Sequence, residues 1–158
     1  MQIRIGTRQD EKRIQTLNEA ICREFSREID LKNADCDLIN IEKNYFYQDG
    51  IFLVVETEKE IVACAAASKT DDDHCLIRRI CVAKPFRHRG LARQMLSIIL
   101  THAQRIGFKS VSIGANPFEP PDEKAKSIAA ERVSKVFSAC GFASPGRGVP
   151  LEFRFSAA

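Results

Sequence analysis

The stretch from Leu76 to Ile106 constrains the fold of this chain more than any other. Its first part, Leu76–Val82, is apolar apart from Arg78 and Arg79 and includes β-branched residues, which indicates a strand. Its second part, Leu91–Ile106, repeats apolar residues every three to four positions and predicts an amphipathic helix. A strand that leads into a long one-faced helix predicts a sheet with helices packed on it. The helix side chains expected to face the sheet are Leu91, Met95, Ile98, Ile99 and Ile106.

The rest of the chain alternates between strand and helix patterns without internal repeats. Thr7–Asp10 resembles a capping box, and Asn116–Asp122 is expected to be a loop because it holds three prolines. The expected strands are Gln2–Ile5, Ile51–Glu56, Ile61–Ser68, Ser110–Ile113 and Leu151–Phe155, and the expected helices follow Asp10, run through Leu38–Tyr45 and span Ala125–Cys140. This order predicts an α/β (α+β) domain with a mixed sheet between helices.

The length of 158 residues fits a single domain spanning 1–158. A hydrophobic fraction of 44% and a charged fraction of 28% are ordinary for a soluble globular protein. The longest apolar run, Met95–Leu100, is interrupted by Ser97 and is too short to cross a membrane. Met1–Ile5 lacks the layout of a signal peptide. We therefore expect a cytoplasmic protein without a membrane partner.

The cysteines do not indicate a metal site. None of the six forms a C-x-x-C pair, and no Cys–His–Asn signature accompanies any of them. In a reducing compartment we expect free thiols that pack as small hydrophobic side chains. No bound metal is expected.

The net charge of +3 hides an uneven distribution of charge. Residues 74–118 contain no Asp or Glu but eight Arg or Lys, whereas residues 1–73 carry 16 acidic and 10 basic side chains. A basic middle favours a polyanionic ligand, although a solvated basic face explains it equally well. A nucleic acid is disfavoured, because aromatic residues are only 8% of the chain and the arginines cluster at one loop.

The basic middle centres on Arg87-His88-Arg89-Gly90-Leu91-Ala92-Arg93, where the expected helix begins. The first N–H groups of a helix lack intrahelical partners and lie at the positive end of its dipole, which suits a phosphate or pyrophosphate. Gly90 lets the backbone approach such a ligand without a Cβ atom in the way. The dipole contributes only about 0.3–1 kcal/mol, so several N–H groups and arginines must act together.

Arg87–Ala92 matches the pattern R-x-x-G-x-A, and this segment resembles the pyrophosphate-binding motif of the GNAT N-acetyltransferase superfamily. Ile80–Pro85 is similar to the strand and loop that precede this motif in the family, and the resemblance extends from Ile3 to Phe155. It implies a GNAT-like acyl-CoA N-acyltransferase fold, with a central, mostly antiparallel sheet flanked by helices.

The resemblance also implies an activity. An acetyl group would move from acetyl-CoA to a primary amine of a small molecule or peptide, by direct attack in a ternary complex and without a metal. The protein would act as a monomer or a homodimer. The acidic excess of residues 1–73 tilts the expected acceptor towards a cation, although it serves solubility equally well.

Roles for particular residues follow from the same resemblance. Backbone groups of Ile80 and Val82 should bind the pantetheine arm, and the N–H of Ile80 should polarise the thioester carbonyl. Backbone N–H groups of 87–92 should hold the pyrophosphate, while Arg87 or Arg93 reaches the 3′-phosphate. The residues expected to bind the cofactor are Ile80, Cys81, Val82, Arg87, His88, Arg89, Gly90, Leu91, Ala92, Arg93 and Asn116, the last of which a turn asparagine explains at least as well.

The catalytic residues are not assigned by the sequence. Phe137–Phe142 is similar to the Y-x-x-x-G-F junction of the family, but Phe137 cannot donate a proton as the tyrosine does. Ser134, Cys140 or water would have to replace it. The glutamate that many family members carry is also missing, since Leu76–Arg79 hold its positions. The carboxylates and histidine considered as bases are Glu24, Glu28, Asp35, Asp37, Glu56 and His74. A non-catalytic acyl-CoA-binding module, or transfer of another acyl group, is therefore the alternative.

Overall fold

The computed structural model describes residues 1–113, 131, 134–144 and 151–157, and the structural statements below concern these residues. Six strands form one sheet in sequence order. They are β1 (Gln2–Ile5), β2 (Ile51–Glu56), β3 (Ile61–Lys69), β4 (His74–Val82), β5 (Ser110–Ile113) and β6 (Glu152–Arg154). All neighbours are antiparallel except β4 and β5, which are parallel. The predicted mixed, mostly antiparallel sheet is confirmed.

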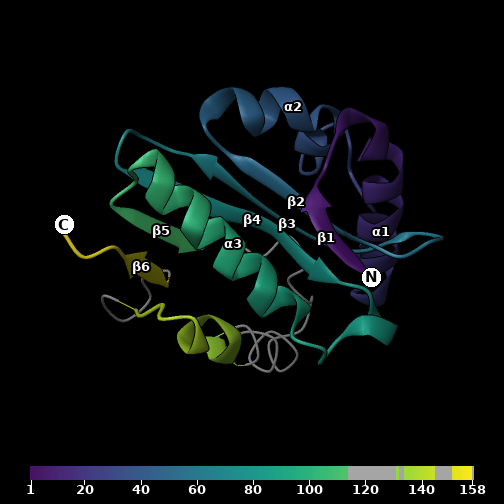
Figure 1. Cartoon of the computed structure of the whole chain (residues 1–158). Helices are drawn as coiled ribbons and strands as arrows, with labels where there is room; N and C mark the ends of the chain where they lie inside the picture. Colours follow the sequence, from purple (N-terminus) through teal and green to yellow (C-terminus); the bar gives the residue numbers. More distant parts are fainter. Residues whose placement is uncertain (114–130, 132–133, 145–150, 158) are drawn as a thin grey trace.

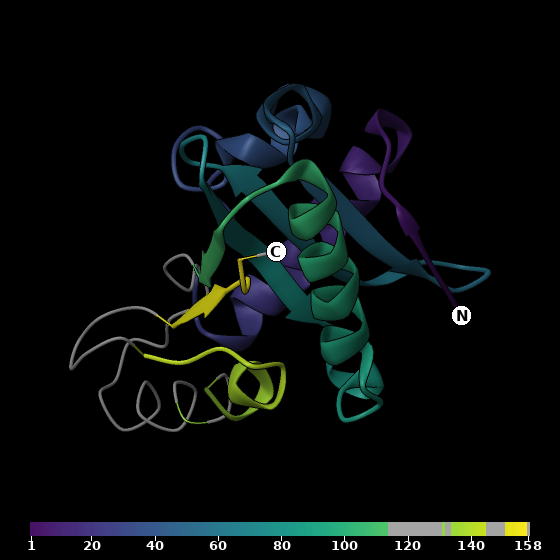
Figure 2. The same cartoon turned by 60° about the vertical axis from the view of Figure 1, so that its left-hand side comes forward.

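Helices cover both faces of this sheet, as Figures 1 and 2 show. One face carries α1 (Glu11–Glu24), α2 (Ile41–Asn44) and the short 3₁₀ turns at Arg8–Asp10, Cys36–Ile39 and Phe46–Gln48. The other face carries α3 (Leu91–Ile106) and the helical residues 134–139. Because β1 and β6 are opposite edges, the two ends of the chain lie on opposite sides of the molecule (Figure 1).

Strand β3 lies in the middle of the fold and is buried from Ile61 to Ser68. Its centre is made of small residues, Ala63, Cys64 and Ala65–Ala67, which leave room for α1 on one face and α3 on the other. Each face has its own hydrophobic core. The strand therefore fixes the distance between the two helical layers.

Helix α3 has the bounds predicted from the sequence, and Leu91, Met95 and Ile99 face the sheet as expected. The prediction was wrong for Ile98 and Ile106, which are 38% and 45% exposed. Leu96 and Ala103 are buried instead. Ile98 lies at the edge of the apolar stripe and Ile106 in the last turn, so neither reaches the sheet.

The predicted elements near the C-terminal part of the chain are only partly within the described residues. The loop at 116–122 and the first residues of the expected helix at 125–140 lie outside them. Residues 134–139 are helical, and Gly141, with a φ of +92°, ends this helix as expected. The N–H of Phe142 donates to the carbonyl of Phe137 at 3.1 Å, which closes the last turn.

No helix in the described part of the chain is long and apolar enough to span a bilayer.

Candidate functional site

Strands β4 and β5 separate partway along their length. They pair only from His74 opposite Ser110 to Ile77 opposite Ile113. The rest of β4, Arg78–Val82, continues along β3 but has no strand partner on its other side among the described residues. This stretch, which we call the open edge, can offer its backbone N–H and C=O groups to an extended ligand.

A bulge lies within the open edge. Ala66 pairs with Arg78 and Cys64 with Cys81, so Arg79 and Ile80 together face the single residue Ala65. Arg79 has a φ of +45°, a backbone conformation that bulky residues rarely adopt. The extra residue reverses the alternation of the strand, and Ile80 then packs towards the α3 core while Cys81 joins the α1 core.

The side chain of Arg79 is held by an ion-pair network under the sheet. It is 5% exposed, and its Nη1 donates to Asp35 Oδ1 at 2.6 Å while its Nε donates to Asp37 Oδ2 at 2.9 Å. Its Nη2 donates to the carbonyl of Ala34 at 3.0 Å and to Asp37 Oδ1. Arg27 pairs with the other oxygen of Asp35 at 2.6 Å. The segment 34–37, which precedes α2, is thereby tied to the bulge.

The network favours the charged forms of Arg79 and Asp35. Burial opposes the charge of Arg79, but hydrogen bonds and attraction from Asp37 and Asp35 outweigh it and raise the pKa of the guanidinium. Burial likewise disfavours ionisation of Asp35, yet the N–H of Asp30 and the guanidinium of Arg79 hold the pKa of that carboxyl below its usual value. The Tyr45 hydroxyl donates to Asp37, and burial together with this carboxylate raises the pKa of the phenol.

Two thiols lie beneath the bulge on the α1 side. Cys64 Sγ donates to the carbonyl of Arg79 at 3.3 Å and lies 3.4 Å from Cys81 Sγ. The contact with Cys64 and burial raise the pKa of Cys81 well above its ordinary value, so this thiol is not a nucleophile. All six cysteines are free, and no group of three or more metal-ligating side chains gathers in the described residues.

The chain leaves β4 through a 3₁₀ turn at Lys84–Phe86 and reaches α3 in a left-handed backbone. His88 and Gly90 have φ values of +61° and +76°, and Gly90 is the N-cap of α3. The first N–H that bonds back into this end belongs to Gln94, which donates to the carbonyl of Gly90 at 3.0 Å. In the described part of the chain no acceptor meets the N–H groups of 88–93. We call this run of free donors the helix start.

Arginines surround the helix start in different ways. Arg93 is exposed, and no described residue partners its side chain. Arg89 donates to the carbonyl of Pro85 at 3.1 Å, and its guanidinium lies 5.2 Å from the centre of the Phe86 ring. Arg87 donates from Nε to the carbonyl of Val82 at 2.9 Å and pairs with Glu24 at 2.9 Å. Arg87 therefore connects the helix start directly with the open edge.

Most of the side chains considered as general bases are either paired with arginines or distant from the bulge. Asp35 and Asp37 are taken up by Arg79, and Glu56 pairs with Arg4 at 2.7 Å and Arg13 at 2.6 Å. His74 lies at the other end of β4, about 20 Å from Ile80 along an extended strand. Its Nδ1 is 2.6 Å from Ser110 Oγ. Among these candidate bases, Glu28 alone is exposed and has no partner within the described residues.

Phe137, at the position of the family tyrosine, is part of the α3 core. Its side chain is 2% exposed and meets the ring of Phe142 edge-on, with the ring centres 5.1 Å apart. Cys140 is half-buried and packs against the same core. No hydroxyl or carboxyl group stands at this position, as the sequence indicated.

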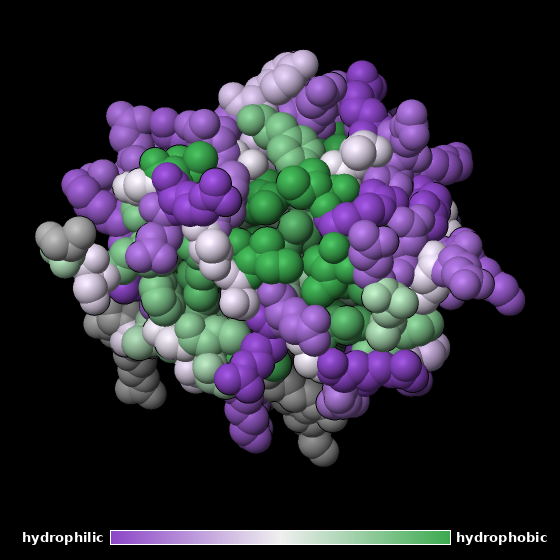
Figure 3. All heavy atoms as spheres, in the orientation of Figure 1, coloured by the Kyte–Doolittle hydropathy of each residue, from purple (hydrophilic) through white to green (hydrophobic). Residues whose placement is uncertain are grey.

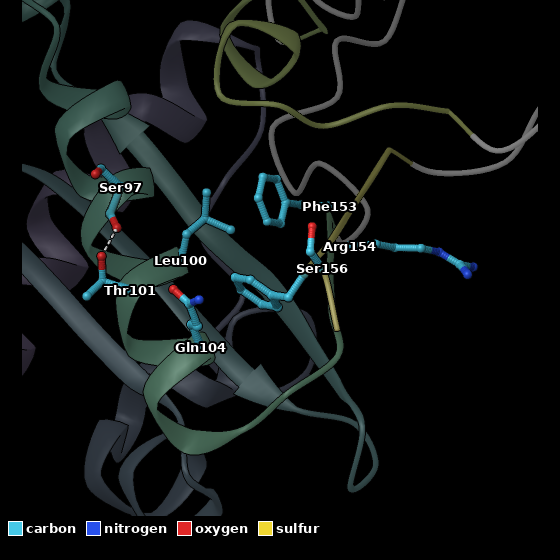
Figure 4. Close-up of a pocket in the computed structure, with 8 residues that line it drawn as sticks. Ser97, Leu100, Thr101, Gln104, Phe153, Arg154 and Ser156 are labelled. Atoms are coloured by element: carbon cyan, nitrogen blue, oxygen red, sulfur yellow. Dashed lines mark hydrogen bonds between the residues drawn. The ribbon is translucent and has the colours of Figure 1, made fainter. Parts of the chain in front are cut away.

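Two surface hollows of the described residues lie elsewhere. Figure 4 shows one between α3 and β6, lined by Leu100, Gln104, Phe153 and Arg154 among others. A second runs between α3 and the β1–β2 edge, where hydrophobic side chains gather near the centre of the face in Figure 3. Both follow the C-terminal half of α3 and are separate from the helix start.

The structure thus brings most of the predicted site residues into two adjoining places. Ile80, Cys81 and Val82 lie on the open edge, and residues 88–93 form the helix start, with Arg87 directly before it. Asn116 lies outside the described residues. The sequence analysis missed the Arg79 network and the Glu24–Arg87 pair. Two consecutive arginines inside a strand were the available signal, because one of them must point to a buried face unless the strand is irregular.

An open strand edge that leads to a helix with free N–H groups and arginines defines a class of site for an extended ligand with a polyphosphate end. The sequence model of the Acetyltransferase (GNAT) family matches residues 14–126, which is most of the chain. This chain therefore belongs to the GNAT acetyltransferase family, and the resemblance noted from the sequence is confirmed.

Solved structures agree on the fold. A GNAT-family acetyltransferase from Staphylococcus aureus has a TM-score of 0.79 at 18% identity, with 98% of this chain and 99% of that chain covered. An acetyltransferase from Salmonella typhimurium, solved with acetyl-CoA, has a TM-score of 0.71 at 17% identity and covers 100% of this chain and 95% of its own. At these identities the likeness concerns the fold.

The curated relatives are much longer than this chain. An N-acetylaspartate synthetase from Xenopus tropicalis is 28% identical over 77% of this chain and 43% of its own length. A probable N-acetyltransferase camello from the same organism is 30% identical over 49% of this chain and 36% of its own. The matched part of the chain spans less than half the length of these relatives.

Proposed function

We propose that this protein is an acetyl-CoA-dependent N-acetyltransferase that moves an acetyl group to a primary amine of a small molecule or peptide. The observation that carries the proposal is the helix start, where consecutive N–H groups of 88–93 have no acceptor in the described chain and arginines stand beside them. Family membership and the name of one curated relative, a probable N-acetyltransferase, support it.

The residues of this chain fit the cofactor in two parts. The N–H groups of the helix start, with Arg87 and Arg93, would bind the phosphates. The open edge at Ile80–Val82 would bind the pantetheine arm through its backbone, as an added strand does. Acetyl-CoA supplies the thioester from which the acetyl group is transferred. Asn116, just after β5, remains a proposed cofactor ligand only.

Alignment is the main contribution that these residues would make to the rate. Holding the thioester and the amine in an attacking arrangement lowers the barrier by roughly 7–11 kcal/mol. We propose that the bulge directs the N–H of Ile80 towards the open edge, where it would donate to the thioester carbonyl as negative charge develops there. The amine nitrogen would bond to the carbonyl carbon and give up a proton to water. The carbon–sulfur bond would then break, and the thiolate would take a proton from water, since Phe137 has none to give.

The attacking amine must first lose a proton. For a lysine-like amine with a pKa of about 10.4, deprotonation at pH 7 costs about 4–5 kcal/mol. The carboxylates of Asp35, Asp37 and Glu56 are already paired with arginines, so we propose that water carries this proton away. The rate should then rise with pH towards the pKa of the amine itself.

The acceptor is proposed only as an amine class. The acidic excess of residues 1–73 favours a cationic acceptor, and arginines outside this segment offset only part of it. Asp35 and Asp37 pair with Arg79, and Glu24 pairs with Arg87. Asp10 and Glu56 pair with Arg4, which lies within the segment and leaves the excess unchanged.

Calorimetric titration of acetyl-CoA tests the proposal. We expect micromolar binding to the wild type, and at least a tenfold loss in the double variant Arg87→Glu with Gly90→Glu. The matched control is Arg105→Glu with Gly107→Glu, which makes the same two changes at the other end of α3. Binding unaffected in the first variant, or absent in the wild type, contradicts the cofactor site.

A screen of amines for release of free thiol from acetyl-CoA then tests transfer. The second candidate function is a non-catalytic acyl-CoA-binding module, which the buried Phe137 favours because no proton donor stands at its position. Tight binding without thiol release from any amine would support that alternative, and release with one acyl chain but not acetyl would indicate another acyl group.

We also propose that residues 1–158 act as one domain, in the cytoplasm, as a monomer or homodimer. One sheet joins Gln2 to Arg154, which supports a single domain. Light scattering of the purified chain measures the oligomeric state directly.

A further inference from the structure

The bulge in β4 has a conformation that its own sequence does not favour. Arg79 has a φ of +45° without being glycine, and such residues persist only where the surroundings fix them. The next residue, Ile80, carries the N–H that would meet the thioester carbonyl. Whatever holds Arg79 in this conformation therefore also sets the direction of that N–H.

Contacts of both the side chain and the backbone carbonyl of Arg79 account for its conformation. All three guanidinium nitrogens donate, to Asp35, to Asp37 and to the carbonyl of Ala34. Its own carbonyl accepts from Cys64 Sγ at 3.3 Å. The two carboxylates are fixed in turn, because Arg27 and the N–H of Asp30 bind Asp35.

We propose that Arg79 is a positioning residue that holds the bulge so that the Ile80 N–H is directed at the thioester carbonyl. The inference rests on the proposed function. Arg79 does not touch the substrate in this arrangement, because it is 5% exposed and every guanidinium nitrogen is engaged within the protein. It acts through Ile80, and its guanidinium ties the segment 34–37 to the strand.

The planar fork of arginine is required for this role. Asp37 accepts from Nε and Nη2, and Asp35 accepts from Nη1, a set of donors that a lysine ammonium cannot reproduce. Arg79→Lys keeps the buried charge, so its two carboxylates remain neutralised. It removes the fork, which leaves the bulge free to relax.

The test uses acetyl-CoA labelled with ¹³C at the carbonyl. Infrared difference spectra give the stretching frequency of the bound thioester, and calorimetry gives the ratio of the affinities for acetyl-CoA and CoA. A hydrogen bond from Ile80 lowers the frequency and favours the acetylated form. Neither quantity responds to a general loss of stability, as long as the protein is folded.

The matched control is Arg4→Lys. Arg4 is another arginine that joins two carboxylates, Asp10 and Glu56, but it lies in β1 at the far edge of the sheet. We expect Arg79→Lys to lose most of the frequency shift. Its ratio of affinities for acetyl-CoA and CoA should fall at least threefold, while its affinity for CoA stays within about twofold of the wild type. Arg4→Lys should keep the wild-type shift and ratio.

Asp37→Asn provides a second variant should Arg79→Lys fail to fold. In this variant Arg79 retains its ion pair with Asp35, and the thioester frequency should shift by an intermediate amount. A wild-type shift and ratio in the folded Arg79 or Asp37 variant overturns the inference and leaves the proposed function standing. Absence of acetyl-CoA binding to the wild type overturns both.

Discussion

The bulge of β4 and the helix start of α3 are neighbours along the chain, yet polar groups are hydrogen-bonded within the protein at the first and free of partners among the described residues at the second. At the bulge, each guanidinium nitrogen of Arg79 has a partner inside the protein, and the side chain is 5% exposed. At the helix start, the N–H groups of 88–93 have no acceptor within the described chain, and Arg93 points into solvent.

The difference separates two tasks within one site. A group that is fully bonded inside the protein is fixed before a ligand arrives, so it can set geometry but cannot bind. A group without an internal partner costs little while water solvates it and is free to meet a ligand. The bulge accordingly suits positioning, and the helix start suits binding.

The largest expected effect is the loss of the buried charge at the bulge. Arg79→Leu leaves the carboxylate of Asp37 without a cation and the fully buried carboxylate of Asp35 with Arg27 alone, which should cost about 3–5 kcal/mol of unfolding free energy. Arg93→Leu at the helix start should stay within about 0.5 kcal/mol of the wild type. Urea denaturation measures both, and similar losses would remove the distinction between the regions.

The second-largest expected effect is a loss of unfolding free energy at low pH, when Asp35 at the bulge is protonated. Burial disfavours ionisation of Asp35, but the N–H of Asp30 and the guanidinium of Arg79 dominate and lower its folded-state pKa. Its contribution is therefore complete above the unfolded pKa of about 3.9 and is lost as pH falls through the lower folded value.

Unfolding free energies measured from pH 6 to pH 2 test this assignment. Below about pH 4, Asp35→Asn should reduce the slope of stability against pH by up to about 1.4 kcal/mol per unit. A slope equal to that of the wild type would mean that Asp35 is not depressed in the folded state.

A smaller effect should separate the two ends of α3. Gly90 and Gly107 both have positive φ, +76° and +102°, so Ala at either should cost about 1–2 kcal/mol of stability through backbone strain. Neither new Cβ meets a neighbour closer than 3.8 Å. Only Gly90→Ala should also weaken binding of acetyl-CoA in calorimetry. Equal binding by both variants would show that the helix start is not the phosphate site.

The smallest effect concerns Arg87, the one residue of the helix start with a carboxylate partner. Its pair with Glu24 is about one-third exposed on each side, and such pairs contribute about 0–1 kcal/mol. Glu24→Gln should therefore free Arg87 for phosphate and tighten acetyl-CoA binding by up to about fivefold. Glu19→Gln, which breaks the 2.6 Å pair with Arg23 on the same helix, is the control and should not change it. Weaker binding by Glu24→Gln would mean that Glu24 supports the site.

Local signals in the sequence predicted several elements residue by residue. The bounds of α3, the strand at Ser110–Ile113 and both ends of the β2 strand follow from apolar spacing and from the glycines beside them. The helix start was also predicted, because Gly90 and the arginines around it are contiguous in the chain. Strand β4 begins two residues earlier than expected, at His74, since its pairing with Ser110 depends on β5.

The sequence by itself determined that this chain has a mixed sheet between helices and a basic turn with a glycine after its fourth strand, because each of these depends on residues close together in the chain. Only the tertiary structure decided that Arg79 and Ile80 share one partner and that Asp35 and Asp37 serve Arg79 rather than an acceptor. The contacts of Arg79 with Asp35 and Asp37 join residues more than 40 positions apart. A carboxylate reads alike in sequence whether solvent or a buried guanidinium faces it, and only packing brings that guanidinium close.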